Sequence, residues 1–162
     1  MKSFPFSACL LVAACFLVSG CNYDFPLTAK PTRPIEPGLV GDWETFDKDE
    51  HKTEHMNVRR LDASTYVVSL DGDLYRVFHS DFAGVTLLSV QNLQPGGDEG
   101  KYIYYRYALN ADHDHLSLWG VREKIVPDET KTAADAQKLI KANLTNPKLY
   151  GGETQFTRKK SG

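Results

Sequence analysis

The chain has few cysteines, and none of them lies beyond residue 21. Its 162 residues include three cysteines, Cys9, Cys15 and Cys21. The rest of the chain therefore has no thiol, which excludes disulfide bonds, thiolate metal sites and cysteine nucleophiles from it. A domain built from this part must be stabilised by its hydrophobic core alone, and the chain is long enough for that.

An excess of charge of one sign is missing as well. The chain carries 19 basic and 21 acidic residues, for a formal net charge of −2. Binding to nucleic acid or to an anionic membrane surface needs a basic excess, so we expect no nucleic-acid partner. No glycine-rich phosphate loop follows a strand-like segment and opens a helix, which leaves nucleotide binding without support. We therefore expect no cofactor.

The N-terminal apolar run is short. It covers residues 8–18, roughly half of the ~20 residues that a membrane-spanning helix needs. Lys2 precedes the run, and the small residues Ser19 and Gly20 follow it directly before Cys21. A charged start, a short apolar stretch and small residues at its end are typical of an export signal.

The segment Leu17-Val18-Ser19-Gly20-Cys21 resembles the lipobox of bacterial lipoproteins. The resemblance implies a signal peptide, residues 1–20, that is cleaved to leave Cys21 carrying thioether-linked diacylglycerol and, usually, an amide-linked acyl chain. Two or more chains anchor a protein firmly to a membrane. The alternative is an ordinary secretory signal with a cysteine nearby.

The mature chain is also similar to an uncharacterised group of proteobacterial lipoproteins, which implies no activity. In enteric-type lipoproteins an aspartate after the lipidated cysteine favours retention in the inner membrane. Asn22 stands there in this chain. The resemblance therefore implies a lipid-anchored protein of the bacterial cell envelope, at the outer membrane and facing the periplasm.

Proline is concentrated just after the lipobox. Residues 22–38 contain four prolines, at positions 26, 31, 34 and 37, which prevent helix and disfavour internal strands. We predict that residues 21–38, the lipidated cysteine and this segment, form an extended tether that holds the domain off the lipid. The alternative is an arm packed onto the domain through Tyr23, Phe25 and Ile35.

The remaining residues, 39–162, have the pattern of a single β-rich domain. Runs of β-branched and aromatic residues recur between turn signals. The predicted strands cover residues 41–46, 56–61, 65–70, 73–79, 85–91, 101–109, 115–126 and 154–158. Asp71-Gly72 predicts a two-residue hairpin. Thr132 to Leu144 has helical spacing, with Thr132 as its cap. The pattern predicts a mainly β fold, an antiparallel meander barrel or sandwich of about eight strands with one late α-helix.

Gly41-Asp42-Trp43 resembles the Gly-x-Trp signature on the first strand of lipocalin-like (calycin) barrels. The resemblance implies that Trp43 packs across the closed end of a barrel, and a late helix before a short last strand fits that topology. It also implies an arginine near the last strands, with Arg122 and Arg158 as the two candidates.

Three histidine-containing segments are candidate sites of chemistry. Residues 51–55 match H-x-x-E-H, the zinc motif of inverted zincins, but that chemistry needs a helix and the surroundings predict a solvated hairpin loop. Residues 112–115 have the composition of a turn. Residues 79–81 cannot form a local catalytic triad, because neighbouring strand residues point to opposite faces. We therefore expect no metal site, no catalytic residue and no enzymatic activity.

The aromatic strand 101–109 offers a candidate binding face. Alternation along a strand divides its side chains between two faces. One face holds Ile103, Tyr105, Tyr107 and Leu109, and the other holds Tyr102, Tyr104 and Arg106. One interpretation makes the first set core and the second a surface stripe. The other makes the second set, extended by Trp119, a face that binds a partner through tyrosine and arginine.

Together these features favour a non-enzymatic, lipid-anchored envelope protein that binds a partner protein or a small apolar ligand. Eight-stranded barrels are either filled by side chains or hold one small ligand. A cavity of several hundred cubic ångströms would favour ligand carriage, and a solid core with an exposed aromatic stripe would favour protein docking. The alternative is an inhibitor or accessory factor of a cell-envelope enzyme that docks through loops 47–54 or 96–100.

Overall fold

The structure is a computed structural model that describes residues 22–47 and 51–159. The predicted signal peptide, residues 1–20, and the predicted lipidation site, Cys21, lie outside the described residues.

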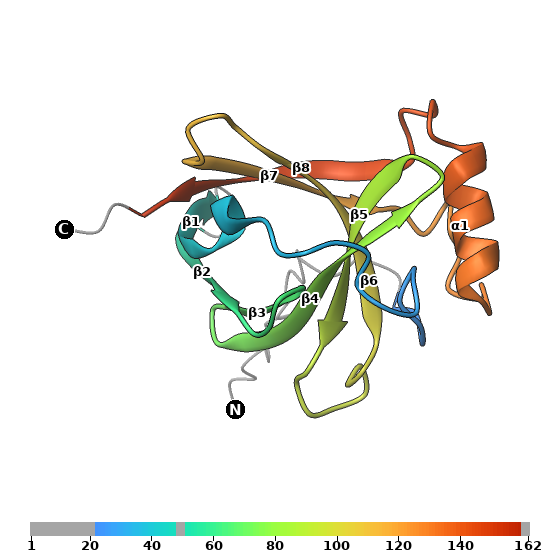
Figure 1. The fold of residues 1–162 in the computed structure, drawn as a ribbon, viewed down its shortest axis with the longest axis horizontal. Helices are drawn as coiled ribbons and strands as arrows, with labels where there is room; N and C mark the ends of the chain where they lie inside the picture. The colour runs from blue at the N-terminus through green and yellow to red at the C-terminus, as the bar shows by residue number, and fades with distance from the viewer. Residues whose placement is uncertain (1–21, 48–50, 160–162) are drawn as a thin grey trace, which may run out of the picture.

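Eight antiparallel strands follow one another around a closed barrel, each hydrogen-bonded to the next (Figure 1). They are β1 (Gly41–Asp47), β2 (Lys52–Arg60), β3 (Thr65–Leu70), β4 (Asp73–Phe82), β5 (Val85–Asn92), β6 (Tyr102–Leu109), β7 (His115–Val121) and β8 (Tyr150–Arg158). The barrel closes where β8 pairs with β1, with Trp43 opposite Arg158. The predicted meander barrel is confirmed, and the sandwich alternative is wrong.

The hairpin predicted at Asp71-Gly72 is confirmed. Leu70 pairs with Asp73 across it, and both central residues have positive φ, 49° at Asp71 and 104° at Gly72. A two-residue turn of this conformation matches the right-handed twist of the flanking strands. It brings the end of β3 and the start of β4 together at one end of the barrel.

Three strand boundaries differ from the prediction by four or more residues. β2 begins at Lys52 rather than at residue 56, β7 ends at Val121 rather than at residue 126, and β8 begins at Tyr150 rather than at residue 154. Polar or glycine-rich residues enter β2 and β8 because β1 and β7 offer them hydrogen-bond partners. Pairing with a neighbouring strand outweighs intrinsic β-propensity here.

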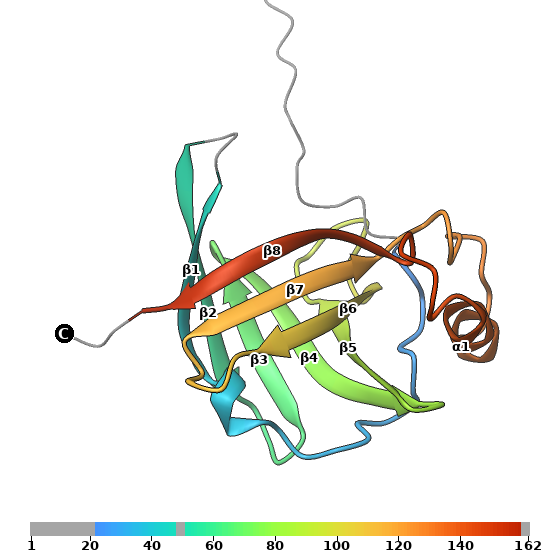
Figure 2. The same cartoon turned by 90° about the horizontal axis from the view of Figure 1, so that it is seen from above.

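One helix, α1 (Ala133–Ala142), lies between β7 and β8 in the sequence and packs against the outside of the barrel (Figure 2). Its predicted cap is confirmed, because the Thr132 hydroxyl accepts a hydrogen bond from the Asp135 backbone amide at 3.1 Å. Ala136 and Ile140 are fully buried. Leu144, the last residue of the predicted helical range, lies beyond the helix and is 40% exposed.

Residues 22–40 form an arm along the outer wall of the barrel rather than a free tether. The Tyr23 amide donates to the Tyr102 carbonyl at 2.9 Å, and the Tyr102 amide donates back at 2.7 Å. Leu27 is fully buried, and the Ile35 amide donates to Ala63. The prolines keep the segment extended, but apolar side chains between them dock it against the strands. The tether prediction for residues 21–38 is therefore corrected for the described residues 22–38.

The arm ends in the short 3-10 helix η1 (Pro37–Leu39), which lies across the end of the barrel where β1 begins. Two hydrophobic clusters result. The inner one fills part of the barrel and includes Trp43, Met56 and Leu88. The outer one lies between the wall, the arm and α1 and includes Leu27, Tyr104 and Ile140. The wall is therefore covered on one side and encloses an interior on the other.

Candidate functional site

The interior of the barrel contains a cavity of about 340 Å³. Alternation along the strands turns one set of side chains inward, and this set is mainly aliphatic and aromatic. The lining includes Met56, Val58, Val68, Leu70, Tyr75, Val77, Leu88, Val90, Ile103, Tyr105, Leu116, Leu118 and Phe156. The side chains therefore leave the barrel partly hollow, at a size within the range of small-molecule sites.

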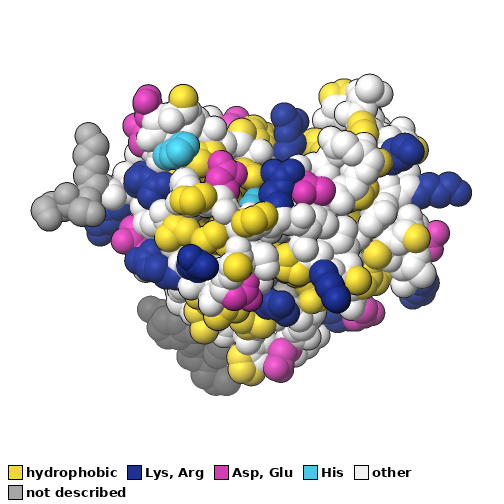
Figure 3. Space-filling view, in the orientation of Figure 1, with side chains coloured by type: hydrophobic (Ala, Val, Ile, Leu, Met, Phe, Trp, Pro, Cys, Tyr) yellow, Lys and Arg dark blue, Asp and Glu magenta, His cyan; other side chains and the backbone are white. Residues whose placement is uncertain are grey.

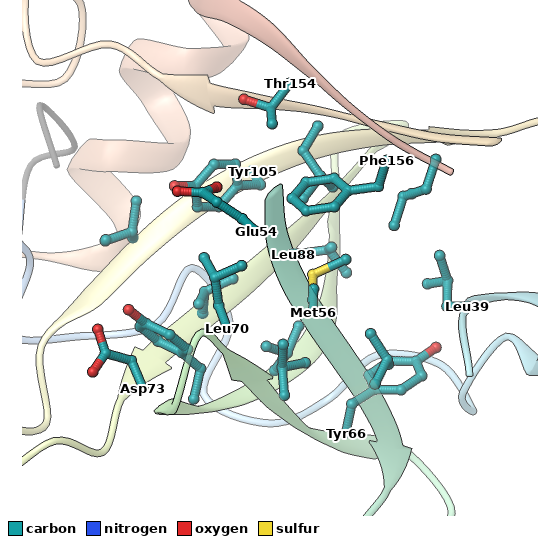
Figure 4. Close-up of a pocket in the computed structure, with 18 of the residues that line it drawn as sticks. Leu39, Glu54, Met56, Tyr66, Leu70, Asp73, Leu88, Tyr105, Thr154 and Phe156 are labelled. Atoms are coloured by element: carbon teal, nitrogen blue, oxygen red, sulfur yellow. The ribbon is translucent and has the colours of Figure 1, made fainter. Parts of the chain in front are cut away.

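One end of the cavity is sealed. Leu39 and Tyr66 lie at this end in Figure 4. Trp43 is 1% exposed, and its indole Nε1 donates to the Leu39 carbonyl at 3.0 Å. η1 and the first strand are thereby held together across the barrel floor.

Arg158 completes the floor from the last strand. Its guanidinium lies 4.2 Å from the Trp43 ring centroid. It donates to the carbonyls of Val40 at 2.9 Å and His113 at 2.5 Å, and to that of Gly38. A cation over an indole face that also bonds several carbonyls ties three segments together. Of the two candidate arginines, Arg158 is therefore the one that packs on Trp43.

The packing of Arg158 explains why glycine is needed at position 41 of the Gly-x-Trp segment. A Cβ at Gly41 would lie 2.0 Å from Nη1 of Arg158. Any larger residue would displace the guanidinium from the Trp43 ring. Gly41, Trp43 and Arg158 therefore form one packing unit.

The opposite end of the cavity is a polar mouth. Lys52, Glu54, Asp71 and Asp73 line it, and Figure 4 shows Glu54 and Asp73 at the end away from Leu39. Lys52 forms an ion pair with Asp71. A hydrogen bond from the His55 amide, with help from Lys52, lowers the pKa of Asp71. The mouth therefore carries charged groups while the walls are apolar.

A partly buried polar cluster lies in the wall near the sealed end. The Tyr107 hydroxyl donates to Glu36 Oε2 at 2.8 Å and lies 3.1 Å from Nε2 of His79. Because Tyr107 gives its proton to Glu36, it accepts from His79, which places the imidazole proton on Nε2. His79 is fully buried, and within the described part of the chain its Nδ1 has no hydrogen-bond partner.

Burial sets the ionisation of this cluster. Burial, followed by the nearby Arg33 charge, lowers the pKa of His79 below its ordinary value. Burial, followed by the hydrogen bond to Glu36, raises the pKa of Tyr107, and burial raises the pKa of Tyr66 to about 12. The imidazole and both phenols are therefore neutral near pH 7, as expected for polar groups enclosed in the fold.

The predicted binding face does not form one open surface. Tyr102 is 9% exposed and Tyr104 is fully buried. Tyr23 of the arm stacks on Tyr104 with 4.5 Å between ring centroids, and the Tyr104 hydroxyl donates to the Phe25 carbonyl at 2.7 Å. The arm therefore occupies the tyrosine face, so the surface-stripe interpretation is wrong for both tyrosines.

The other two residues of that face lie beside the arm. Arg106 is exposed and lies 5.2 Å from the Trp119 ring centroid and 5.5 Å from that of Tyr150. Trp119 is half-buried. These contacts form a small surface cluster in which arginine stacks on its own chain's aromatic rings.

The three histidine-containing segments lie in different parts of the fold. The predicted loop at residues 51–55 is largely strand, because β2 starts at Lys52; Glu54 is buried in the barrel while His55 is exposed. His113 lies in the β6–β7 turn with φ of 56°. His79 is in the inner wall, and the neighbouring Ser80 bonds Thr28 of the arm on the outer wall. Within residues 22–47 and 51–159, no three His, Asp or Glu side chains are grouped to hold a metal.

The outer surface has no strongly charged field on the side that carries η1. Figure 3 shows acidic, basic and hydrophobic side chains interspersed across this face.

None of the helices in the described residues combines the length and the hydropathy that crossing a membrane requires.

The closed eight-stranded barrel with this Trp43–Arg158 floor is consistent with a calycin-like fold. No family model, curated protein or solved structure matches the chain.

Sequence reasoning missed the residues that line the cavity. Period-two alternation assigns inward sides within each strand, and it placed Ile103 and Tyr105 on one face correctly. It does not reveal whether inward side chains meet or leave space between them. Glu54 was also missed, because its segment was predicted to be loop.

Proposed function

We propose that this protein binds one small, largely apolar ligand in the interior of its barrel, as a lipid-anchored protein of the cell envelope. The observation that carries the proposal is the cavity of about 340 Å³, sealed at one end and bordered by charged residues at the other. A ligand inside such a cavity would remove its apolar surface and that of the walls from water, at ~25 cal/mol per Å².

The composition of the lining supports binding rather than chemistry. The walls are formed by side chains such as Val68, Leu88 and Val90, which supply neither acid nor base nor nucleophile. The charged groups of the lining, Lys52, Glu54, Asp71 and Asp73, lie at the mouth, and the remaining lining is mainly aliphatic and aromatic. This distribution suits a ligand with an apolar body and a polar group at one end.

The location of the aromatic side chains favours a ligand over a partner protein. A docking face built on Tyr102 and Tyr104 would compete with the arm, which already covers them. Arg106 and Trp119 leave only a small exposed cluster. We therefore place the binding function in the interior.

The anchor is proposed from the lipobox resemblance. Cleavage before Cys21 and acylation of its sulfur would hold the barrel at a membrane. Intact-mass analysis of protein from its own envelope should find a chain that starts at Cys21 and carries acyl groups. A chain without that added mass would contradict the anchor.

Two neighbouring valines of β3 provide a matched test of ligand binding. Val68 lines the cavity, while Val67 is on the other face of the same strand. Native mass spectrometry of protein purified from its envelope should identify a retained small molecule. That molecule should bind Val68→Phe at least about ten-fold more weakly than the wild type, because the larger ring fills the cavity.

Val67→Phe should bind the same molecule with wild-type affinity, as measured by calorimetry. Equal affinities of the wild type and both variants would place the ligand outside the barrel. Purification of the protein as a stoichiometric complex with another polypeptide and with an empty cavity would instead favour the partner-protein alternative.

A further inference from the structure

The open end of the barrel carries three separate features that suit a membrane surface. We propose that this end docks on the lipid bilayer, so that the mouth of the cavity opens onto the membrane rather than into solvent. This proposal rests on the proposed function and adds the orientation of the barrel and the source of its ligand.

The first feature is the position of the mouth. In a meander barrel, alternate connections lie at the same end. The β1–β2, β3–β4, β5–β6 and β7–β8 connections therefore share the end that carries Lys52, Glu54 and Asp73. η1 and the β2–β3, β4–β5 and β6–β7 turns lie at the opposite end, as Figure 2 shows.

The second feature is the start of the arm. Tyr23 pairs with Tyr102, the first residue of β6, and therefore lies at the open end. Its ring stacks on Tyr104 and its hydroxyl donates to the Val126 carbonyl at 2.5 Å, which fixes it there. Two residues of chain span at most about 7 Å. Acyl chains on Cys21 would therefore begin beside the mouth, with no spacer between the lipid and the barrel.

The third feature is a rim of exposed hydrophobic side chains. Among the described residues, five large hydrophobic side chains are exposed, and three of them belong to the open end. Phe46 is near the tip of β1 and is 56% exposed, Leu74 is the second residue of β4 and is 44% exposed, and Leu93 follows β5 and is 42% exposed. The Leu93 amide donates to the Leu74 carbonyl at 3.0 Å, which holds these two together. We call these three residues the rim.

The charges at the open end determine which lipid headgroups it can contact. Lys52 and Lys101 form ion pairs with Asp71 and Asp24. Exposed acidic groups are added by Asp73, Asp98 and Glu99. A balance of this kind does not attract anionic headgroups. Contact through the rim would depend on insertion of apolar side chains at the interface, so zwitterionic lipid is the appropriate partner.

This orientation assigns a chemical class to the ligand. When a molecule passes from the bilayer into the cavity, its hydrocarbon part stays in apolar surroundings. Its polar head remains at the mouth, among the charged groups. A single-chain amphiphile of the membrane meets both conditions.

The orientation can be measured on the acylated protein in vesicles of zwitterionic phosphatidylcholine. After cleavage before Cys21 and acylation of its sulfur, the mature chain would have no free thiol, so one added cysteine can carry a fluorophore. Gly97→Cys places it on the β5–β6 loop, where an added Cβ meets nothing within 4 Å. Ala63→Cys places it on the exposed β2–β3 loop at the sealed end. A quencher attached to the lipid should quench the first label several-fold more strongly than the second.

The rim is tested with a matched pair of substitutions. Leu74→Ser combined with Leu93→Ser should weaken quenching of the label at residue 97. Leu61→Ser should not, although Leu61 is 57% exposed, because it lies at the sealed end. Equal quenching of the two labels, or stronger quenching at residue 63, would overturn the proposed orientation.

The outcomes separate the two proposals. Mass analysis that finds no acyl groups would remove the proposed anchor and the orientation with it. An acylated protein that retains its ligand but shows equal quenching would overturn the orientation alone. Strong quenching at residue 97 would support the orientation. If Val68→Phe also bound the ligand as tightly as the wild type, the orientation would stand and the interior ligand site would be overturned.

Discussion

The two ends of the barrel are built from the same strands but are held in different ways. At the sealed end, η1 lies across the opening, and Trp43 and Arg158 link it to the first and last strands. At the open end, hairpins surround a mouth of charged residues, with an exposed Lys52–Asp71 pair between β2 and the β3–β4 turn. Buried packing closes one end, and solvated charge surrounds the other.

Because of this difference, one end of the barrel stabilises the fold and the other gives access to the cavity. A buried tryptophan with a satisfied Nε1–H and an arginine bound to three carbonyls contribute strongly to folding. Exposed ion pairs contribute little because water screens them. The sealed end can therefore stabilise the barrel while the open end remains free to admit a ligand. Substitutions at the two ends should differ accordingly.

Trp43 and Phe46, both on β1, should show the largest contrast. Trp43→Ala should lower the free energy of unfolding by about 3–5 kcal/mol, because it leaves a cavity under η1. Phe46→Ala, at an exposed position near the mouth, should change it by less than about 0.5 kcal/mol. Denaturant unfolding followed by circular dichroism measures both. Similar losses for the two variants would show that the open end is as tightly packed as the floor.

Arg158 should give the next largest effect. Arg158→Ala removes hydrogen bonds to the carbonyls of Gly38, Val40 and His113, and we expect a loss of about 2 kcal/mol from charged hydrogen bonds of this kind. Arg158→Lys should recover only part of it, because an ammonium group cannot reproduce the planar fork. If Arg158→Lys recovered the whole free energy of unfolding in the same experiment, the positive charge of Arg158 alone would account for its effect.

The buried imidazole of His79 should make stability depend on pH. Burial lowers its pKa in the folded protein, while the unfolded chain titrates near the ordinary value of about 6.5. Below pH of about 6.5 the unfolded chain therefore binds more protons than the folded protein, and the free energy of unfolding falls as the pH falls. This contribution is fully present above about pH 6.5.

Thermal unfolding between pH 7.5 and pH 5.5 tests this expectation, in the range where histidine titrates. The decrease should be smaller in His79→Leu and should persist in His55→Gln, whose side chain is exposed. If His79→Leu retained the whole decrease, another group would be responsible for it.

The Lys52–Asp71 pair at the mouth should give the smallest effect. The side chain of Lys52 is 53% exposed, and exposed pairs contribute up to about 1 kcal/mol. Lys52→Gln should therefore change the free energy of unfolding by less than about 1 kcal/mol, with the difference disappearing in high salt. A larger, salt-independent loss would show that the mouth is part of the folding core.

The sequence predicted the strands best where their patterns are local. β3 was predicted with the observed bounds, because Thr65 to Leu70 is β-branched and aromatic and ends at Asp71-Gly72. β2 and β8 were predicted too short, because Lys52–Glu54 and Gly151-Gly152 have low strand propensity and are strands only through pairing. The resemblance of Gly41-Asp42-Trp43 implied an arginine near the last strands, and only the structure shows that Arg158, one of the two candidates, packs on Trp43.

The candidate site was less accessible to sequence reasoning. Ile103 and Tyr105 could be placed on one face of β6, yet the same pattern left a filled and a hollow barrel equally open. Tyr102 and Tyr104 looked suitable for binding because tyrosine is common at interfaces. Their partner is the arm of the same chain, through Tyr23 and Phe25, and the sequence carried no signal for that pairing beyond the apolar residues between its prolines.

The order of amino acids by itself determined the alternation of side chains, the turns, the capped helix and the thiol-free composition, because each depends on neighbours within a few residues. Only the tertiary structure decided that the arm covers the outer wall, that Arg158 reaches Trp43 and that the interior keeps a space of about 340 Å³. These features depend on the distance between side chains from segments far apart in the chain, and hydrophobic burial selects among such arrangements without a local signature.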